Sequence, residues 1–132
     1  DGSAWNVGLR APVPSGGSLQ AASFASVPVR GKSVVTSGVY ERAFVRNGRV
    51  LHHILDPRTG KPAETDVLSA TVIADKSLDA DGYTTALIIM GAEQALTFAE
   101  QTPGIEAVLL TTNARLLQTT GITTKGARLR AG

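Results

Sequence analysis

Cysteine is missing from this chain of 132 residues, and so is any long hydrophobic run. The first absence excludes disulfides and thiolate metal sites, and it leaves the redox compartment open. The second predicts a chain without a transmembrane segment, because no apolar run reaches the roughly 18 residues that cross a bilayer. Glycine-rich phosphate-binding motifs and internal repeats are absent as well, which argues against a doubly wound nucleotide fold and a solenoid.

Aromatic residues and net charge are scarce, at 5% of the chain and +2 at pH 7. A nucleic-acid partner is therefore not expected, since such binding needs stacking platforms and basic charge. The charges are nevertheless segregated. Residues 1–61 hold eight basic and three acidic side chains, whereas residues 62–106 hold eight acidic side chains and one lysine. This pattern suits a ligand with phosphates on one side and a cation on the other, although segregated charge usually reflects plain solvation.

The apolar content, 42% of the chain, is enough for the core of one domain. Asn47-Gly48 is the strongest local signal, because this dipeptide favours a two-residue type I′ hairpin. The order of elements predicts an α+β fold, an antiparallel sheet with two consecutive helices packed on it. The tail from Thr123 is expected to fray. We expect strands at residues 5–9, 19–29, 34–36, 39–46, 49–55, 68–74, 106–111 and 115–119, and helices at 77–90 and 92–101.

The stretch His53–Pro62 is typical of a rigid polar loop that follows a strand. Pro57 fixes its own φ, and Gly60 permits a positive φ. Such a loop holds an imidazole, a carboxylate and a hydroxyl in a fixed relation, as positioned chemistry requires. An ordinary turn accounts for the same residues about equally well. The three candidate groups belong to His53, Asp56 and Thr59.

The helix expected at residues 77–90 carries polar groups on its predicted apolar face. At 100° per residue, one stripe contains a carboxylate and a hydroxyl four residues apart, among core-facing apolar side chains. A buried unpaired carboxylate is too costly to keep. Asp81 therefore either caps a nearby backbone group or meets a cation, with Thr85 as a second oxygen ligand. The stripe consists of Leu78, Asp81, Thr85, Ile88 and Ile89.

Four segments in sequence order resemble motifs of the ApbE family, the FAD:protein FMN transferases. Residues 5–9 are similar to the family's W-x-V-G-I strand, and residues 36–42 to its S-G-x-Y segment. His53–Pro62 resembles the signature H-I-x-D-P-x-T-G-x-P, and residues 81–86 resemble the metal-binding helix D-x-x-x-T-A. The resemblance covers almost the whole chain. It implies a T-fold-like domain of which residues 1–132 form the C-terminal portion, either as a single domain or as a half-domain.

The resemblance also implies an activity: Mg²⁺-dependent transfer of FMN from FAD to a threonine hydroxyl of an acceptor protein, with release of AMP. Asp81 and Thr85 correspond to the metal ligands, hard oxygen donors that suit Mg²⁺. His53 is placed to take the proton of the threonine, because imidazole titrates near neutrality. His52 faces the opposite way on the strand and is expected to be a neighbour only. The implied flavin-lining residues are Ser37, Gly38, Tyr40, His53, Asp56 and Thr59.

Two departures from the family pattern affect these expectations. Val39 stands where the family often has Asp or Asn, which removes a polar contact at the flavin. In addition, only the C-terminal portion of the family domain is matched. The strand at Trp5 is therefore expected to pair with something outside the chain, either a separate N-terminal half or a second copy in a homodimer. The family further implies a periplasmic or extracytoplasmic, membrane-associated location.

Two rival functions remain open at this stage. One is a non-catalytic module that binds flavin or a partner protein, and the other is an FAD pyrophosphate hydrolase that uses water as the acceptor. The transferase is favoured over the module because a degenerate module would have lost one of the five polar groups. All five are present: His53, Asp56, Thr59, Asp81 and Thr85.

Overall fold

The computed structural model describes residues 2–10, 23–40 and 42–122. Two helices follow eight strands, and two more strands follow the helices. The strands are β1 Trp5–Arg10, β2 Ser23–Val29, β3 Ser33–Gly38, β4 Ala43–Arg46, β5 Arg49–His52, β6 Leu55–Asp56, β7 Lys61–Pro62, β8 Val67–Ala74, β9 Ile105–Thr111 and β10 Leu116–Gln118, and the helices are α1 Ser77–Met90 and α2 Ala92–Gln101.

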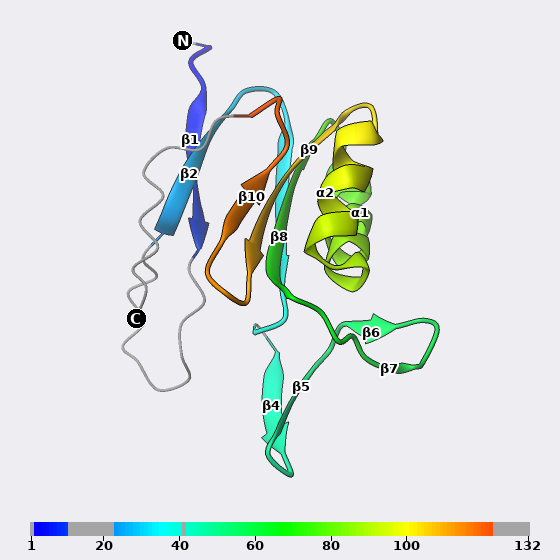
Figure 1. The fold of residues 1–132 in the computed structure, drawn as a ribbon. Coiled ribbons are helices and arrows are strands. Elements are labelled where there is room, and N and C mark those ends of the chain that lie inside the picture. Colours follow the sequence, from blue (N-terminus) through cyan, green and yellow to red (C-terminus); the bar gives the residue numbers. More distant parts are fainter. Residues whose placement is uncertain (1, 11–22, 41, 123–132) are drawn as a thin grey trace.

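A four-stranded antiparallel sheet in the order β10-β9-β8-β3 lies at the centre of the molecule. Both helices cover one face of this sheet, and the antiparallel pair β1–β2 packs on the other face (Figure 1). The α+β architecture, with two consecutive helices on an antiparallel sheet, is confirmed. Neither helix in the described part of the chain is long and apolar enough to cross a bilayer.

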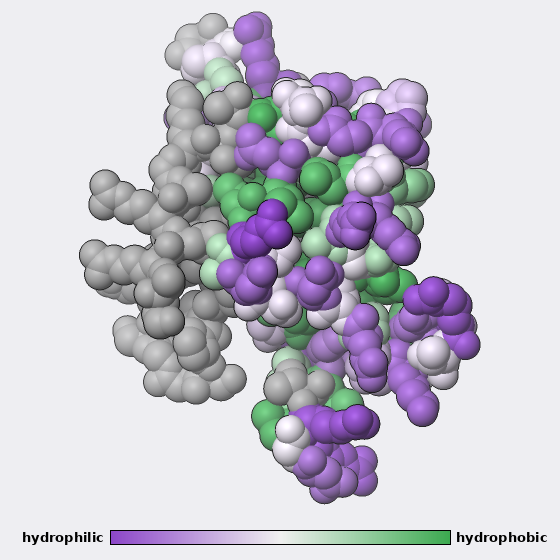
Figure 2. Space-filling view, viewed as in Figure 1, coloured by the Kyte–Doolittle hydropathy of each residue, from purple (hydrophilic) through white to green (hydrophobic). Residues whose placement is uncertain are grey.

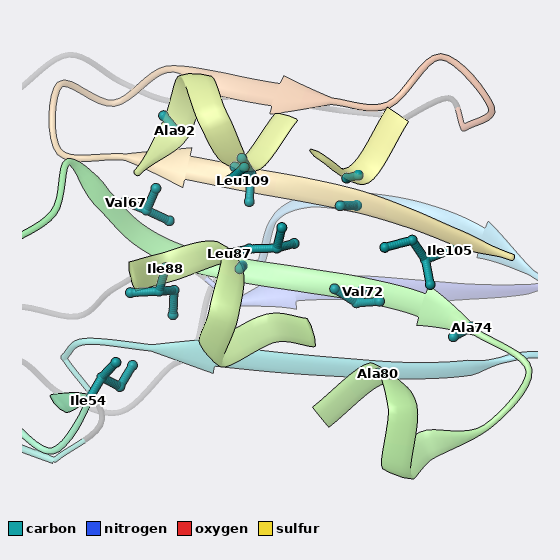
Figure 3. Packing of buried hydrophobic residues seen from close by; sticks show 14 of the residues in the cluster. Ile54, Val67, Val72, Ala74, Ala80, Leu87, Ile88, Ala92, Ile105 and Leu109 are labelled. Atoms are coloured by element: carbon teal, nitrogen blue, oxygen red, sulfur yellow. The ribbon is translucent and has the colours of Figure 1, made fainter. Parts of the chain in front are cut away.

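Side chains of β8 alternate between the two faces of the sheet, as the strand period requires. Ala70 and Val72 join the helix-side cluster, which Figure 3 shows in close-up, whereas Ile73 packs with the β1–β2 side. Small residues such as Ala70 and Ala107 let the helices approach the sheet closely. The core is therefore built from both faces of one sheet.

The two helices begin and end as the sequence predicts, at residues 77–90 and 92–101. Gly91 ends α1 because it adopts a φ of 82°, which a residue with a Cβ rarely takes. The first turn of α2 is capped from outside the helix: Asp66 Oδ1 accepts a hydrogen bond of 2.8 Å from the backbone N–H of Ala92. Asp66 thereby ties the segment before β8 to the helix pair.

The predicted apolar face of α1 is only partly correct: Ile88 is buried and Ile89 packs against the core, but the other three residues of the stripe are exposed. Leu78 is 80% exposed, and Asp81 and Thr85 are exposed as well. The face that packs on the sheet instead carries Ala80, Thr84, Leu87 and Ile88, spaced i, i+4, i+7 and i+8. The premise of a buried Asp81 is therefore wrong, because its carboxylate is in solvent, and the capping alternative does not apply, because no side-chain bond caps α1.

The Asn47-Gly48 turn is confirmed as a tight hairpin between β4 and β5, with φ angles of 53° and 73°. Both strands are shorter than predicted, because the backbone of Val39 bonds Leu68 and the chain bends at His53. The hairpin projects from the body of the fold, and its surface is partly hydrophobic (Figures 1 and 2). Phe44 and Val45 on β4 are 60% and 71% exposed.

The first strand has a partner within the chain that the sequence did not predict, whereas pairing with a partner outside the chain stays a prediction. β1 pairs with β2 in antiparallel register, with Trp5 opposite Val29. The Trp5 side chain is nevertheless 80% exposed. Residues 19–22 of the predicted second strand, and the tail from Thr123 that is expected to fray, lie outside the described residues.

Candidate functional site

Two hydroxyl groups in series join the end of β3 to α1. Ser37 Oγ lies 2.7 Å from Thr84 Oγ1, and Thr84 Oγ1 donates a hydrogen bond of 2.8 Å to the carbonyl oxygen of Asp81. Thr84 is fully buried between the helix and the sheet. This bond brings the predicted flavin-lining strand end beside the helix that carries the predicted metal ligands.

Asp81 and Thr85 stand one helical turn apart on the exposed side of α1. Within the described residues their side chains make no hydrogen bond or ion pair, so their oxygens are available to a ligand. No group of three or more His, Cys, Asp or Glu side chains in this part of the chain is arranged to hold a metal. Two oxygen donors fit Mg²⁺, which keeps several waters and binds phosphate oxygens instead of a full protein cage.

Gly38 and Tyr40 lie against each other. A Cβ atom on the buried Gly38 would stand 2.8 Å from the Tyr40 ring, so the ring occupies the space that the glycine leaves. The family resemblance implies that Gly38 and Tyr40 line the flavin, and here the Tyr40 ring fills the space beside Gly38. Val39 packs partly buried against the core, which gives its apolar side chain a structural role.

Arg58 holds Asp56, the last residue of β6, at the start of the loop that follows this strand. Asp56 Oδ1 accepts bonds from the backbone N–H of Arg58 at 2.8 Å and from its Nε at 3.0 Å, and Oδ2 accepts from Nη2 at 2.7 Å. These side-chain bonds, followed by the backbone bond, lower the pKa of Asp56 below its ordinary value of 3.8. The Asp56 carboxylate, predicted to contact the flavin, thus braces its own loop.

This bracing predicts an acid-sensitive loop. Because the pKa of Asp56 is lower in the folded chain, the ion pair stabilises the fold above the ordinary value of 3.8 and is lost as the pH falls below it. The difference in melting temperature between the wild-type chain and Asp56→Asn should be constant above about pH 5 and should shrink as the pH falls through the lowered pKa of Asp56.

Asp75→Asn is the matched control, because it breaks an exposed pair with Lys32. Exposed ion pairs contribute little to stability, so this variant should melt near the wild-type temperature at every pH. A difference for Asp56→Asn that persists unchanged at the acid end would contradict the role of the ion pair.

The turn after Asp56 closes with a left-handed residue, as the sequence indicates. Gly60 has a φ of 67°, and its N–H bonds the carbonyl oxygen of Asp56 at 2.8 Å. The exposed Thr59 accepts a bond from the N–H of Lys61 through its Oγ1 at 3.2 Å. Hollows of about 410 and 430 Å³ flank this hairpin. The first is lined by Asp56, Arg58, Thr59, Lys61, Pro62 and Glu64, and the second by Arg49, Leu51, His52, Lys61, Pro62, Ala63 and Glu64.

The two neighbouring histidines have different surroundings. His52 is half-buried, and its Nε2 donates a bond of 3.0 Å to the carbonyl oxygen of Ala63. His53 is exposed and makes no hydrogen bond within the described residues. Next to it, Ile54 is buried in the same cluster as Ile88 of α1 (Figure 3). The packing of Ile54 therefore fixes the backbone that carries the free imidazole.

The predicted site residues thus form two groups. The first gathers at the β3–α1 junction, and the second lies in the loops from β5 to β7. No hydrogen bond or ion pair of the described residues joins His53 to Asp81 or Thr85.

Sequence reasoning missed Thr84 and Arg58, both of which hold a site residue in place. The i, i+4 spacing of Ala80 and Thr84 was the available signal for the first. The Asp-x-Arg turn was the available signal for the second.

The antiparallel α+β fold thus presents exposed oxygen donors on α1, an exposed imidazole at His53 and a polar loop braced by Arg58. A family model described as "ApbE family" matches residues 1–109. The chain belongs to the ApbE family.

Relatives with the name FAD:protein FMN transferase match most of this chain. The FAD:protein FMN transferase of Treponema pallidum is 43% identical over 118 residues, which cover 89% of this chain and 32% of that protein. A protein of the same name from Klebsiella pneumoniae is 40% identical over 113 residues, 86% of this chain and 34% of that one.

Crystal structures give the same likeness. The ApbE protein of Thermotoga maritima has a TM-score of 0.75 and 29% identity, covering 90% of this chain and 37% of that one. The apo flavinyl transferase ApbE of Pseudomonas stutzeri has a TM-score of 0.63 and 35% identity, covering 96% and 36%. The chain spans about a third of the length of the relatives it matches.

Proposed function

We propose that this chain forms part of an FAD:protein FMN transferase site, in which FMN passes from FAD to a threonine hydroxyl of an acceptor protein and AMP is released. One observation supports this most. The Ser37–Thr84 contact of 2.7 Å fastens the strand end that would line the flavin to the helix that would hold the metal. The names of the relatives support the same reaction class.

His53 would act as the general base. Its exposed imidazole has no partner in the described part of the chain, so it is free to accept the proton of the incoming threonine. The threonine oxygen then forms a bond to the phosphorus of the FMN phosphate, and the pyrophosphate P–O bond to AMP breaks.

Mg²⁺ is the metal that we propose for Asp81 and Thr85. When bound, it would neutralise charge on the pyrophosphate. Asp81 contributes a carboxylate and Thr85 a hydroxyl, and both are exposed on one side of α1. Phosphate oxygens, waters or another polypeptide segment would complete the coordination.

In our proposal, a second polypeptide segment completes this site. The chain spans about a third of its relatives' length, and Trp5, Phe44 and Val45 are 60–80% exposed. Large exposed apolar side chains are candidates for surfaces that another polypeptide covers when they gather in one patch. The remaining portion of the family domain, or a second copy of the chain, would supply that polypeptide.

The test is incubation with FAD, Mg²⁺ and an acceptor peptide that contains threonine, alone and with the remaining two-thirds of the T. pallidum relative. Covalent FMN on the peptide, detected by mass, is the expected product. Release of free FMN and AMP without modified peptide would identify the pyrophosphate hydrolase instead. FAD binding without any product would identify the non-catalytic module.

A further inference from the structure

Thr84 places a hydroxyl group in an otherwise apolar contact between α1 and the sheet. Its buried neighbours on the same helix face are Ala80, Leu87 and Ile88. Packing alone would be satisfied by valine, which has the same shape, so the hydroxyl calls for a separate reason. That reason lies in its two hydrogen-bond partners, one on the strand β3 and one on the helix itself.

The direction of the two bonds follows from proton counting. A carbonyl oxygen can only accept, so the single hydroxyl proton of Thr84 is donated to the carbonyl oxygen of Asp81. Thr84 Oγ1 must then accept a hydrogen bond from Ser37 Oγ, and this bond uses the hydroxyl proton of Ser37. The half-buried Ser37 hydroxyl is left with lone pairs only. It can accept a hydrogen bond from a ligand N–H or O–H, and it cannot donate one to a phosphate oxygen.

Both ends of this series of hydrogen bonds adjoin predicted site residues. The Asp81 carbonyl belongs to the residue whose carboxylate we assign to the metal, and Thr85 directly follows Thr84. A helix attached to a sheet by apolar contacts can rotate by small amounts, whereas a hydrogen bond fixes its rotation. The Ser37–Thr84 bond therefore sets how the exposed side chains of α1 stand relative to the end of β3.

We propose that Thr84 is a positioning residue that couples the two halves of the ligand site: the Ser37 end of β3, which takes a hydrogen-bond donor of the flavin nucleotide, and the oxygen donors Asp81 and Thr85 on α1. This inference rests on the proposed function. The part of the nucleotide at Ser37 is consequently a ring N–H or a sugar hydroxyl, and the phosphates lie toward α1.

The test compares Thr84→Val, which keeps the shape and removes the hydroxyl, with Thr84→Ser, which keeps the hydroxyl. Thr71→Val is the matched control. Thr71 is also buried, and its Oγ1 pairs with Thr36 Oγ1 at 2.8 Å, but it belongs to the side of β8 that faces β1–β2. FAD affinity is measured by calorimetry with and without Mg²⁺. Amide hydrogen exchange of residues 81–85 is measured without any ligand.

We expect Thr84→Val to weaken FAD binding in the presence of Mg²⁺ by about tenfold, which is the effect of one lost hydrogen bond. The same variant should speed amide hydrogen exchange in α1. Thr84→Ser should restore both readouts, and Thr71→Val should change neither. Should Thr84→Val fail to fold, Ser37→Ala breaks the same bond from the strand, and its exchange in α1 decides the coupling.

Three outcomes are decisive. Unchanged FAD affinity in a folded Thr84→Val variant, while the wild-type chain binds, overturns the positioning role and leaves the proposed function standing. Unchanged exchange at residues 81–85 in both Thr84→Val and Ser37→Ala also overturns it. No binding of FAD by the wild-type chain at any Mg²⁺ concentration, alone or with the completing segment, overturns the proposed function together with this inference.

Discussion

Asp81→Ala is expected to abolish Mg²⁺-dependent binding of FAD and to leave the fold in place. The carboxylate is exposed and makes no hydrogen bond in the described part of the chain, so its removal costs almost no stability. Of the two oxygen donors that this chain would supply to the metal, only the Asp81 carboxylate is charged, so its loss should weaken metal binding most. We expect the Mg²⁺ dependence of FAD affinity, measured by calorimetry, to disappear, while the melting temperature stays the same.

Asp79→Ala provides the control for this experiment. Asp79 is an exposed carboxylate in the first turn of the same helix, where it interacts favourably with the helix dipole. Its removal should slightly lower stability and leave the Mg²⁺ effect intact. Equal loss of Mg²⁺-dependent binding in both variants would show that general negative charge on α1, and not Asp81 itself, attracts the metal.

His53→Asn is expected to reduce FMN transfer by about 10²- to 10⁴-fold, the usual contribution of a general base. Asparagine keeps a polar group at the exposed position but cannot take up the proton. FAD affinity should remain within a few-fold of wild type, because the proton is transferred only in the reaction. Transfer is measured as covalent flavin on the acceptor peptide, with the completing segment present.

His52→Asn tests whether this effect is specific to one histidine. His52 donates to the carbonyl oxygen of Ala63, so its loss should lower stability by about 1 kcal/mol and change transfer little. Comparable losses of transfer in the two variants at a temperature where both are folded would refute the assignment of a single base to His53.

Local signals accounted for the elements that the sequence located correctly. Gly91 separates the helices because its backbone needs a positive φ, and Asn47-Gly48 makes a tight turn for the same reason. These conformations depend on one or two residues, so no knowledge of the tertiary fold is needed. The loop around Gly60 was predictable on the same grounds.

Non-local packing accounts for the errors. Apolar residues are distributed around much of the circumference of α1, so its sequence is compatible with two different buried faces. The face that packs on the sheet is the one that carries the small residues Ala80 and Thr84. No local signal marks β2 as the strand that pairs with β1 inside the chain. A local feature was missed as well: Arg58, two residues after Asp56, binds both oxygens of that carboxylate.

The projecting β4–β5 hairpin connects two predicted site segments. Its four paired positions, Ala43 opposite His52 through Arg46 opposite Arg49, span about 10 Å at the usual rise per strand residue. Tyr40, whose ring lies against Gly38, precedes the hairpin in the sequence, and His53 follows it directly. The exposed Phe44 and Val45 on β4 therefore stand on the hairpin that joins the segment of the aromatic ring to the segment of the imidazole.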